Sequence, residues 1–460
     1  MTRSFKIGKK FLTGGKRIKF MKRAVKLRTA FILLLIMSAM LIFLAIALKI
    51  QREISLMPDG EYEFPSLYIS SELDPFNVER ELWHSGQISV RDTTAPFLFE
   101  NAAVKLRGRG NASWVRGSDK RPLRLRFQMP HAMLDSGYAA RDWVLIANLF
   151  DLSLIRNHAA FYLADLLDGM NWTPFSRFVH LYINDEYKGV YQLVDERDVG
   201  PGRIQLEFHP EPASSEYLFE LDGAVTTWLN EKTSGNVEDV DFFGVDEKAY
   251  DIHFPKSGDW NGHLEYLRDF VLNAKEIIKT HDYNAIAAII DIPSFVDFYI
   301  VQELFKNADV GNRSMFFQLK GHGKTRRIHF GPVWDFDRSS GNMLHWNEPT
   351  HIYAGERCGW LSELIATPEI FDLVKKRWNE IAPGPVAQLI EHIGYLMDNY
   401  EEAFERNFRC YDYIFEAESE PAWFVMLPEE TKSLTTFREQ SQYFVDWLNS
   451  RISWLNNYFS

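Results

Sequence analysis

The spacing of apolar residues changes near residue 260, and this change constrains the fold more than any other feature of the sequence. Before it, apolar and polar side chains alternate over short runs such as Leu67–Ser70, Val104–Arg107 and Leu123–Phe127, as in half-buried strands. After it, apolar residues recur at helical spacing over Leu264–Lys279 and Ser294–Asn307. Strands followed by helices predict an α+β fold of two lobes.

Turn and cap residues predict where several elements begin and end. Two strand-like runs flank Asn184-Asp185, which predicts a hairpin, and a second hairpin is predicted around Gly321 and Gly323. Ser153 is predicted to begin a helix as its N-cap. Beyond residue 360 the chain is predicted to be helical to its end, over residues 360–366, 369–381, 386–408 and 435–458.

Charge is unevenly distributed along the chain. The 460 residues include 51 Lys+Arg and 63 Asp+Glu, for a net charge of −12, but residues 1–28 hold 11 of the basic residues and no acid. The rest of the chain is therefore distinctly acidic, which argues against nucleic-acid binding, because such proteins usually need a basic face. An apolar content of 46% with 25% charged residues excludes a disordered chain and a polytopic membrane protein.

Thr29–Leu48 is a run of 20 residues without a charge. At about 1.5 Å per residue it is long enough to cross a bilayer core of about 30 Å. A buried core helix is the alternative, and the length and uniform hydropathy disfavour it. Because no small-residue cleavage site follows before Lys49, the run predicts an uncleaved signal anchor of a single-pass cell-membrane protein. The basic tail 1–28 would stay in the cytoplasm, and the domain beyond a stalk at 49–64 would lie outside.

Cys358 and Cys410 are the two cysteines of the chain. In an oxidising compartment they could form a disulfide that closes a loop of about 50 residues. Two buried thiols fit the sequence equally well, and the chain has neither a C-x-x-C motif nor a Cys/His metal motif.

Basic residues gather in segments suited to an anion. Arg107-Gly-Arg-Gly-Asn-Ala-Ser-Trp114 follows a strand, and its glycines would let backbone amides approach a phosphate, although a β-turn is the simpler explanation. Lys120 precedes a strand that carries basic residues. These residues could bind a phosphate, or they could simply be exposed to solvent. Arg156 lies near the N-terminus of the helix that Ser153 is predicted to begin, where a positive charge opposes the macrodipole. This indicates a carboxylate or phosphate partner unless Arg156 is a surface residue. Glu196 ends another strand and could pair with Lys120 or Arg156, or belong to a charged turn.

The sharpest signal is a set of carboxylates near Trp334 and Phe336. Asp335 and Asp337 are two residues apart, and placing both beside apolar rings is costly unless a cation meets them. Carboxylate oxygens suit Mg²⁺ or Mn²⁺ bound together with a substrate phosphate. Asp309 follows an apolar helix and is separated from Asp335 by one hairpin, so the two could reach the same end of a sheet.

Taken in order, these segments resemble the CotH (spore coat protein H) kinase family. The resemblance covers about residues 65–345, and residues 346–460 are interpreted as a helical part of the same domain. The matching strings are Arg107–Asn111, Trp114, Lys120–Phe127, Trp143–Leu145, Ser153–Asn157, Gly189–Tyr191, Glu303-Leu304, Asn307–Asp309 and Pro332–Asp337.

The resemblance implies an atypical, secreted protein kinase with a much-altered kinase fold. It implies ATP with Mg²⁺ or Mn²⁺ as cofactors and transfer of phosphate to Ser/Thr of an exported or surface protein. The implied catalytic base is Asp309, and the implied metal ligands are Asp335, Asp337 and Asn312. The residues implied to bind the nucleotide are Arg107, Lys120, Arg156 and Glu196.

Two departures from ordinary protein kinases keep other functions open. Ser314 stands five residues after Asp309, where kinases have a metal-binding Asn, and Asp337 replaces the glycine of D-F-G. A non-catalytic assembly protein of a surface or coat layer is one alternative, and a nucleotidyl transferase using the same acids is another. The acidic domain favours a neutral or basic Ser/Thr-rich partner over an acidic one.

Overall fold

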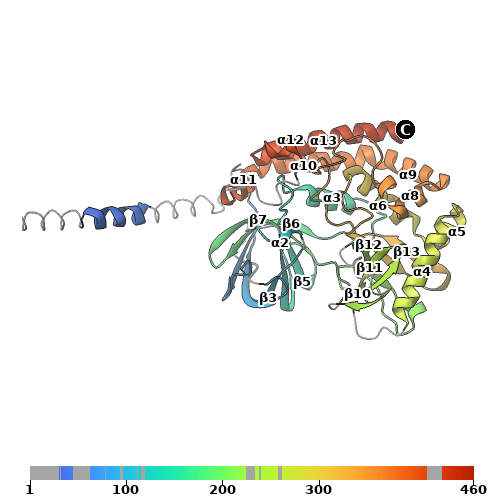
Figure 1. Ribbon diagram of the computed structural model, residues 1–460, viewed down its shortest axis with the longest axis horizontal. Helices are drawn as coiled ribbons and strands as arrows, with labels where there is room; N and C mark the ends of the chain where they lie inside the picture. Colours follow the sequence, from blue (N-terminus) through green and yellow to red (C-terminus); the bar gives the residue numbers. More distant parts are fainter. Residues whose placement is uncertain are drawn as a thin grey trace, which may run out of the picture. The chain divides into compact units, whose positions relative to one another are not determined.

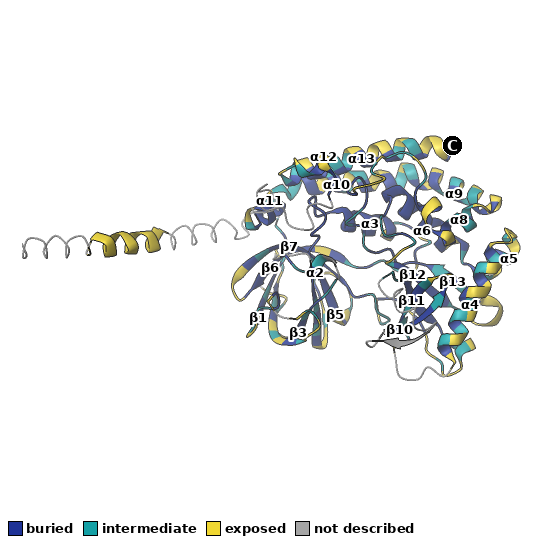
Figure 2. Cartoon of the chain, viewed as in Figure 1, coloured by how far each residue is buried: buried dark blue, intermediate teal, exposed yellow. Residues whose placement is uncertain are grey.

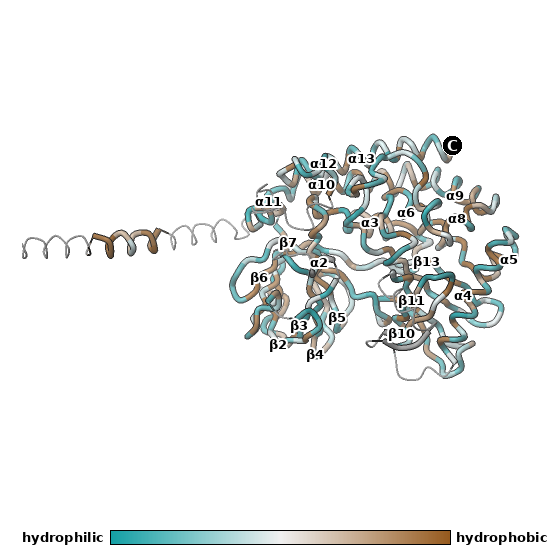
Figure 3. The backbone as a smooth tube through the Cα atoms, viewed as in Figure 1, coloured by the Kyte–Doolittle hydropathy of each residue, from teal (hydrophilic) through white to brown (hydrophobic). Residues whose placement is uncertain are grey.

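The computed structural model describes residues 31, 33–44, 63–77, 79–93, 97–110, 112–115, 120–223, 234–237, 240–256, 262–411 and 427–460. The chain divides into two compact units, Met1–Met57 and Pro58–Ser460. In the first unit residues 33–44 are helical, exposed and apolar (Figure 3). Within the part of the chain that the structure describes, none of the helices combines the length and hydropathy that a membrane crossing requires. The ends of the predicted anchor, 29–48, lie outside the described residues, so the anchor stays a prediction.

The second unit begins with seven strands that close into a barrel in the order β1-β2-β3-β4-β5-β7-β6 (Figure 1). The barrel closes through parallel pairing of β1 with β6, and its other neighbours pair antiparallel. Alternation places Leu123, Leu125 and Phe127 inside, with no exposed surface, while Arg124 and Arg126 face outward. The strands are β1 (Ser66–Ser71), β2 (His84–Arg91), β3 (Phe99–Gly108), β4 (Leu123–Ala132), β5 (Ala139–Ile146), β6 (Ser176–Ile183) and β7 (Glu186–Asp195).

A six-stranded antiparallel sheet follows in the order β13-β12-β8-β11-β10-β9. Both predicted hairpins are confirmed: β6 and β7 turn at Asn184-Asp185, where both residues have positive φ, and β12 and β13 turn at Gly321–Gly323. The strands of this sheet are β8 (Tyr217–Leu221), β9 (Ser234–Val237), β10 (Val240–Val245), β11 (Lys248–Phe254), β12 (Met315–Lys320) and β13 (Arg327–Phe330).

Helices cover the sheet and one end of the barrel (Figure 2). Among them α6 is the most enclosed, because every residue except Pro293 is buried. The longer helices are α3 (Arg156–Asp165), α4 (His263–Ile278), α5 (Tyr283–Ile289), α6 (Ile292–Phe305), α8 (Gly359–Ile365), α9 (Pro368–Ile381), α10 (Ala387–Asn399), α11 (Glu401–Cys410) and α13 (Phe437–Tyr458). The short helices include α2 (Ala112–Val115), α7 (Ala354–Arg357) and α12 (Glu429–Lys432), and the α+β class is confirmed.

Two helix predictions were wrong. The helix predicted over 386–408 is broken at Tyr400, which ends α10 and precedes α11. Ser153 does not cap α3, which begins at Arg156, because the Ser153 hydroxyl donates to the buried carboxylate of Asp151 at 2.6 Å instead.

The cysteines are not bonded to each other in the described structure. Cys358 is buried with its Sγ 3.6 Å from Met315 Sδ, and Cys410 Sγ lies 3.5 Å from the carbonyl of Tyr187. Of the two alternatives that the sequence left open, the structure therefore favours thiols over a disulfide.

Candidate functional site

Asp309 lies just beyond the C-terminus of α6, and Asn307 fixes the loop that carries it. The side chain of Asn307 accepts a hydrogen bond from the Asp309 amide at 3.1 Å and donates to the carbonyl of Trp334 at 3.4 Å. The amide of Ala308 also donates to the carbonyl of Arg338 at 3.1 Å. The loop after α6 and the segment after β13 therefore lie side by side, although they are far apart in the sequence.

The segment after β13 is held by the burial of Phe336. Its ring packs edge-on against Phe305 at 5.5 Å between centroids, and its amide donates to Asn157 Oδ1 at 2.6 Å. Asp335 has a φ of 63°, in the left-handed region. With Phe336 held inside, Asp335 and Asp337 both line the same cavity of about 300 Å³ as Asp309, as the sequence predicted for Asp309 and Asp335.

Ser314 also lines this cavity, and its hydroxyl donates to Asp335 Oδ2 at 3.2 Å. Asn312, the predicted metal ligand, is exposed and is not among the described residues that line the cavity. A left-handed turn at Ser314, with a φ of 55°, leads directly into β12. The residue five positions after Asp309 therefore occupies the place next to Asp335, as Ser rather than Asn.

The three aspartates repel one another electrostatically. Burial, together with the negative charge of Asp335, raises the pKa of Asp309 to about 7. Burial and the charges of Asp335 and Asp309 raise the pKa of Asp337 well above its ordinary value. Arg313, whose Nε lies 3.6 Å from Asp309 Oδ1, and Arg338 offset only part of this repulsion. Carboxylates and a hydroxyl that line one cavity are oxygen donors suited to a hard divalent cation, which would relieve the repulsion.

Another wall of the cavity comes from β8 and β11. Glu220 and Asp251 face each other across these strands, and His253 Nε2 lies 2.8 Å from Glu220 Oε2 and 3.4 Å from Asp251 Oδ2. Burial raises the pKa of Asp251 to about 6. Sequence reasoning missed this cluster, although Glu220-x-Asp222 and Asp251-x-His253 have the two-residue spacing that puts side chains on one face of a strand.

A second cavity, of about 350 Å³, adjoins the first and shares Arg109, Arg197 and His253 with it. Arg107 and Glu196, both predicted to bind the nucleotide, line this second cavity together with Arg124. Arg124 Nε lies 3.2 Å from Glu196 Oε2, and Arg197 pairs with the same carboxylate at 3.6 Å. Burial alone would raise the pKa of Glu196, but Arg124, Arg197 and Arg109 hold it below its usual range.

Arg109 and Arg197 link the two cavities and were not predicted as site residues. Both guanidinium groups lie over the ring of Trp334, at 5.6 Å for Arg109 and 4.5 Å for Arg197. Arg197 also approaches Glu220 Oε2 at 3.6 Å. Burial lowers the pKa of Arg109 to about 10, so it remains a cation at neutral pH.

Lys120 and Arg156 lie elsewhere and are not among the described residues that line these two cavities. Lys120 is buried between the rings of Tyr191 and Tyr411, and burial lowers its pKa to about 7. Arg156 is fully buried and pairs with Asp151 at 2.5 Å, and its guanidinium carbon lies 4.8 Å from the centroid of the aromatic ring of Phe444. The anionic partner expected for Arg156 is thus supplied by a carboxylate of the chain itself.

We expect Arg156→Ala to lower the free energy of unfolding by about 3–5 kcal/mol, because it leaves the carboxylate of Asp151 buried without its cation. Urea unfolding followed by circular dichroism measures the effect. Arg409→Ala, which removes an exposed pair with Glu402, is the matched control and should change stability little. A variant of unchanged stability that fails to bind nucleotide would restore the phosphate role predicted for Arg156.

The fold and cavities define an α+β protein in which clustered carboxylates meet arginines, a combination suited to phosphates and a divalent cation. The family model described as CotH kinase protein matches residues 106–455. This is most of the chain, so the protein belongs to the CotH kinase family, and the resemblance seen in its motifs is confirmed. The match spans the barrel from β3 onward, the sheet and the helices as far as α13. No curated protein matches the chain.

Proposed function

We propose that this protein is a metal-dependent kinase that transfers the γ-phosphoryl group of ATP to a Ser or Thr hydroxyl of an exported protein. The observation that carries the proposal is the convergence of Asp309, Asp335 and Ser314 on one cavity beside an arginine-lined one. Membership of the CotH kinase family supports the proposal at the level of the family. The barrel and the helix-covered sheet would act as two lobes, because both supply residues to the cavity.

In this proposal Asp335 and Asp337 hold Mg²⁺ or Mn²⁺, with the Ser314 hydroxyl beside Asp335. When bound, the ion would neutralise negative charge on the phosphates of ATP. Asn157 has a supporting part, because its hydrogen bond to the Phe336 amide keeps both carboxylates on the cavity side.

Asp309 is proposed to accept the proton of the attacking hydroxyl. The hydroxyl oxygen forms the new bond to the γ-phosphorus, the bond from that phosphorus to ADP breaks, and the proton passes to Asp309. A carboxyl with a pKa of about 7 suits this work near neutral pH, because it can be ionised before the step and hold a proton after it. Arg109 and Arg197 would hold the phosphate oxygens.

The predicted anchor would set this activity outside the cytoplasm, on the outer face of the cell membrane. The partner would be a neutral or basic, Ser/Thr-rich exported protein, and nucleic acid is not a proposed ligand. Because the site would then lie outside the cytoplasm, the proposal also requires ATP in that compartment.

ATP binding by calorimetry on the full chain, with and without Mg²⁺ or Mn²⁺, tests the proposal. Metal-dependent binding is expected. Incubation with ATP labelled at the α- or the γ-phosphate then identifies the group transferred. Label from the γ-position alone supports a kinase, and retention of the α-label would favour the nucleotidyl transferase instead. A folded protein that binds no ATP would favour the assembly protein.

We expect Arg109→Ala to raise the Kd for ATP by about tenfold or more, because it removes a charge-assisted contact to phosphate. Arg109 suits this test because Glu196, whose charge it helps to stabilise, keeps its ion pairs with Arg124 and Arg197 in the variant. Arg91→Ala, on the exposed end of β2, is the matched control. Equal ATP affinity in both variants would remove Arg109 from the nucleotide site.

A further inference from the structure

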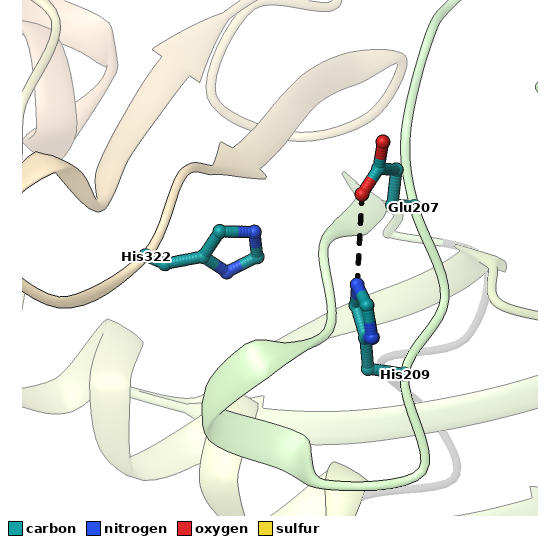
Figure 4. A group of neighbouring side chains, drawn as sticks. All are labelled: Glu207, His209 and His322. Atoms are coloured by element: carbon teal, nitrogen blue, oxygen red, sulfur yellow. Dashed lines mark ion pairs between the residues drawn. The ribbon is translucent and has the colours of Figure 1, made fainter.

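Three side chains suited to a metal ion lie together outside both cavities (Figure 4). Glu207 and His209 come from the segment before β8, and His322 comes from the turn between β12 and β13. One ligand atom from each residue lies within 4.8 Å of the other two. His209 Nε2 is 3.6 Å from Glu207 Oε2, and the two imidazole rings are 5.8 Å apart between centroids.

Glu216 holds the two backbone segments in register. One oxygen of its buried carboxylate accepts from the amide of Glu207 at 2.9 Å, and the other accepts from the amide of Gly321 at 2.7 Å. The side chain of Glu216 thus joins the backbone of Glu207 to the backbone of Gly321, the residue directly before His322.

Arg326 adds a second, independent connection. Its buried guanidinium donates to the carbonyl of Ser215 at 2.6 Å, to Gly321 at 2.9 Å and to Ala213 at 3.2 Å. The backbone under the three ligands is therefore held in place, although His322 lies 113 positions after His209 in the sequence.

From this arrangement we infer that Glu207, His209 and His322 form a site for a Zn²⁺-type cation. Tetrahedral bonds of about 2.0–2.2 Å put ligand atoms roughly 3.4 Å apart, which the Glu207–His209 pair already approaches. The side chains of Glu207 and His209 are 76% and 44% exposed, so small rotations can close the remaining distance without moving the backbone. Solvent can then supply the fourth ligand.

The ligand types separate this site from the carboxylate cavity. Imidazole nitrogen suits Zn²⁺, Co²⁺ and Ni²⁺, whereas Mg²⁺ prefers oxygen ligands. A bound ion would fasten the β12–β13 hairpin to the segment before β8. Its effect would therefore be structural, at a distance from Asp335, and it does not depend on the proposed kinase activity.

Titration of the full chain with Zn²⁺ by calorimetry, in saturating Mg²⁺, tests the inference. We expect one Zn²⁺ per chain, and His322→Ala and His209→Ala should each weaken binding by about 100-fold. Co²⁺ titrated in its place should develop a d–d absorption band that the two variants lack. Saturating Zn²⁺ should raise the Tm of the unaltered protein more than that of either variant.

His345→Ala removes an exposed histidine outside the cluster and is the matched control. Because all the altered histidines are at least partly exposed, circular dichroism is expected to show the same fold in every variant. The inference is overturned if both cluster variants bind Zn²⁺ as the control does. It is also overturned if Zn²⁺ binding is lost in His253→Ala but kept in His322→Ala, which would put the ion on the Glu220–Asp251–His253 cluster.

Discussion

Asp335→Asn is expected to lower phosphoryl transfer by about a thousandfold or more while the protein stays folded, because the amide removes the charge proposed to hold a divalent cation. Asparagine is the right replacement, since the φ of 63° at this position suits Asn better than alanine. Asn can also still accept the hydrogen bond from Ser314. The measurement is transfer of the γ-phosphate at saturating ATP.

A stability measurement makes this test independent of the choice of acceptor protein. Removing the charge of Asp335 relieves its repulsion of Asp309 and Asp337, so the metal-free variant should have a Tm equal to or above that of the unaltered protein. The rise in Tm caused by Mg²⁺ or Mn²⁺ should disappear. Asp372→Asn, on the exposed face of α9, is the matched control. Full transfer activity in Asp335→Asn would contradict the proposed metal role.

Asp309→Asn is expected to lower transfer by about a hundredfold or more and to abolish its rise with pH. In the unaltered protein activity should rise as the pH increases toward about 7, because the base acts in its ionised form. A bound divalent cation favours the carboxylate, so the inflection should lie at or below that value. Initial rates measured from pH 5 to pH 9 give the profile. An unchanged profile in the variant would exclude Asp309 as the base.

The same carboxyl makes the metal-free protein sensitive to pH. Its pKa is about 7 in the folded chain, against an ordinary value of 3.8, so the folded state favours the protonated acid. Its contribution to stability is fully present below about pH 4 and is lost as the pH rises to about 7. At pH 8 without metal, Asp309→Asn should therefore be more stable than the unaltered protein, by on the order of 2 kcal/mol. Urea unfolding at pH 5 and pH 8 measures the difference.

The strands and the two principal acids could be predicted because their signals are local. Alternation along Leu123–Phe127 is a property of neighbouring residues, and it is confirmed by the buried and outward faces of β4. Asp309 and Asp335 lie beside apolar segments, and the burial of those segments restricts where the two carboxylates can lie. The break in the 386–408 helix was missed because helical spacing of apolar residues continues through Tyr400.

The electrostatic partners could not be predicted, because they depend on contacts across the fold. The sequence around Arg156 suggests a phosphate-binding residue. In the structure its partner is Asp151, which lies five positions away and is equally buried. Arg197 directly follows Glu196 in the sequence, and only folding brings its guanidinium over the ring of Trp334. In each case the sequence shows the cation but not the side chain that it contacts in the fold.

The position of Asp309 depends on α6, and α6 is held by parts of the described structure that do not line the cavity. Its sides are fastened to β13 by the Phe295–Phe330 rings, to α9 by Asp297 with Arg377, and to α13 by Glu303 with Arg451. Because α6 is held by contacts on three sides, its position depends on the positions of β13, α9 and α13. A chain that lacks α13 would lose the pairing of Arg451 with Glu303 near the C-terminus of α6, the end that leads into the loop carrying Asp309.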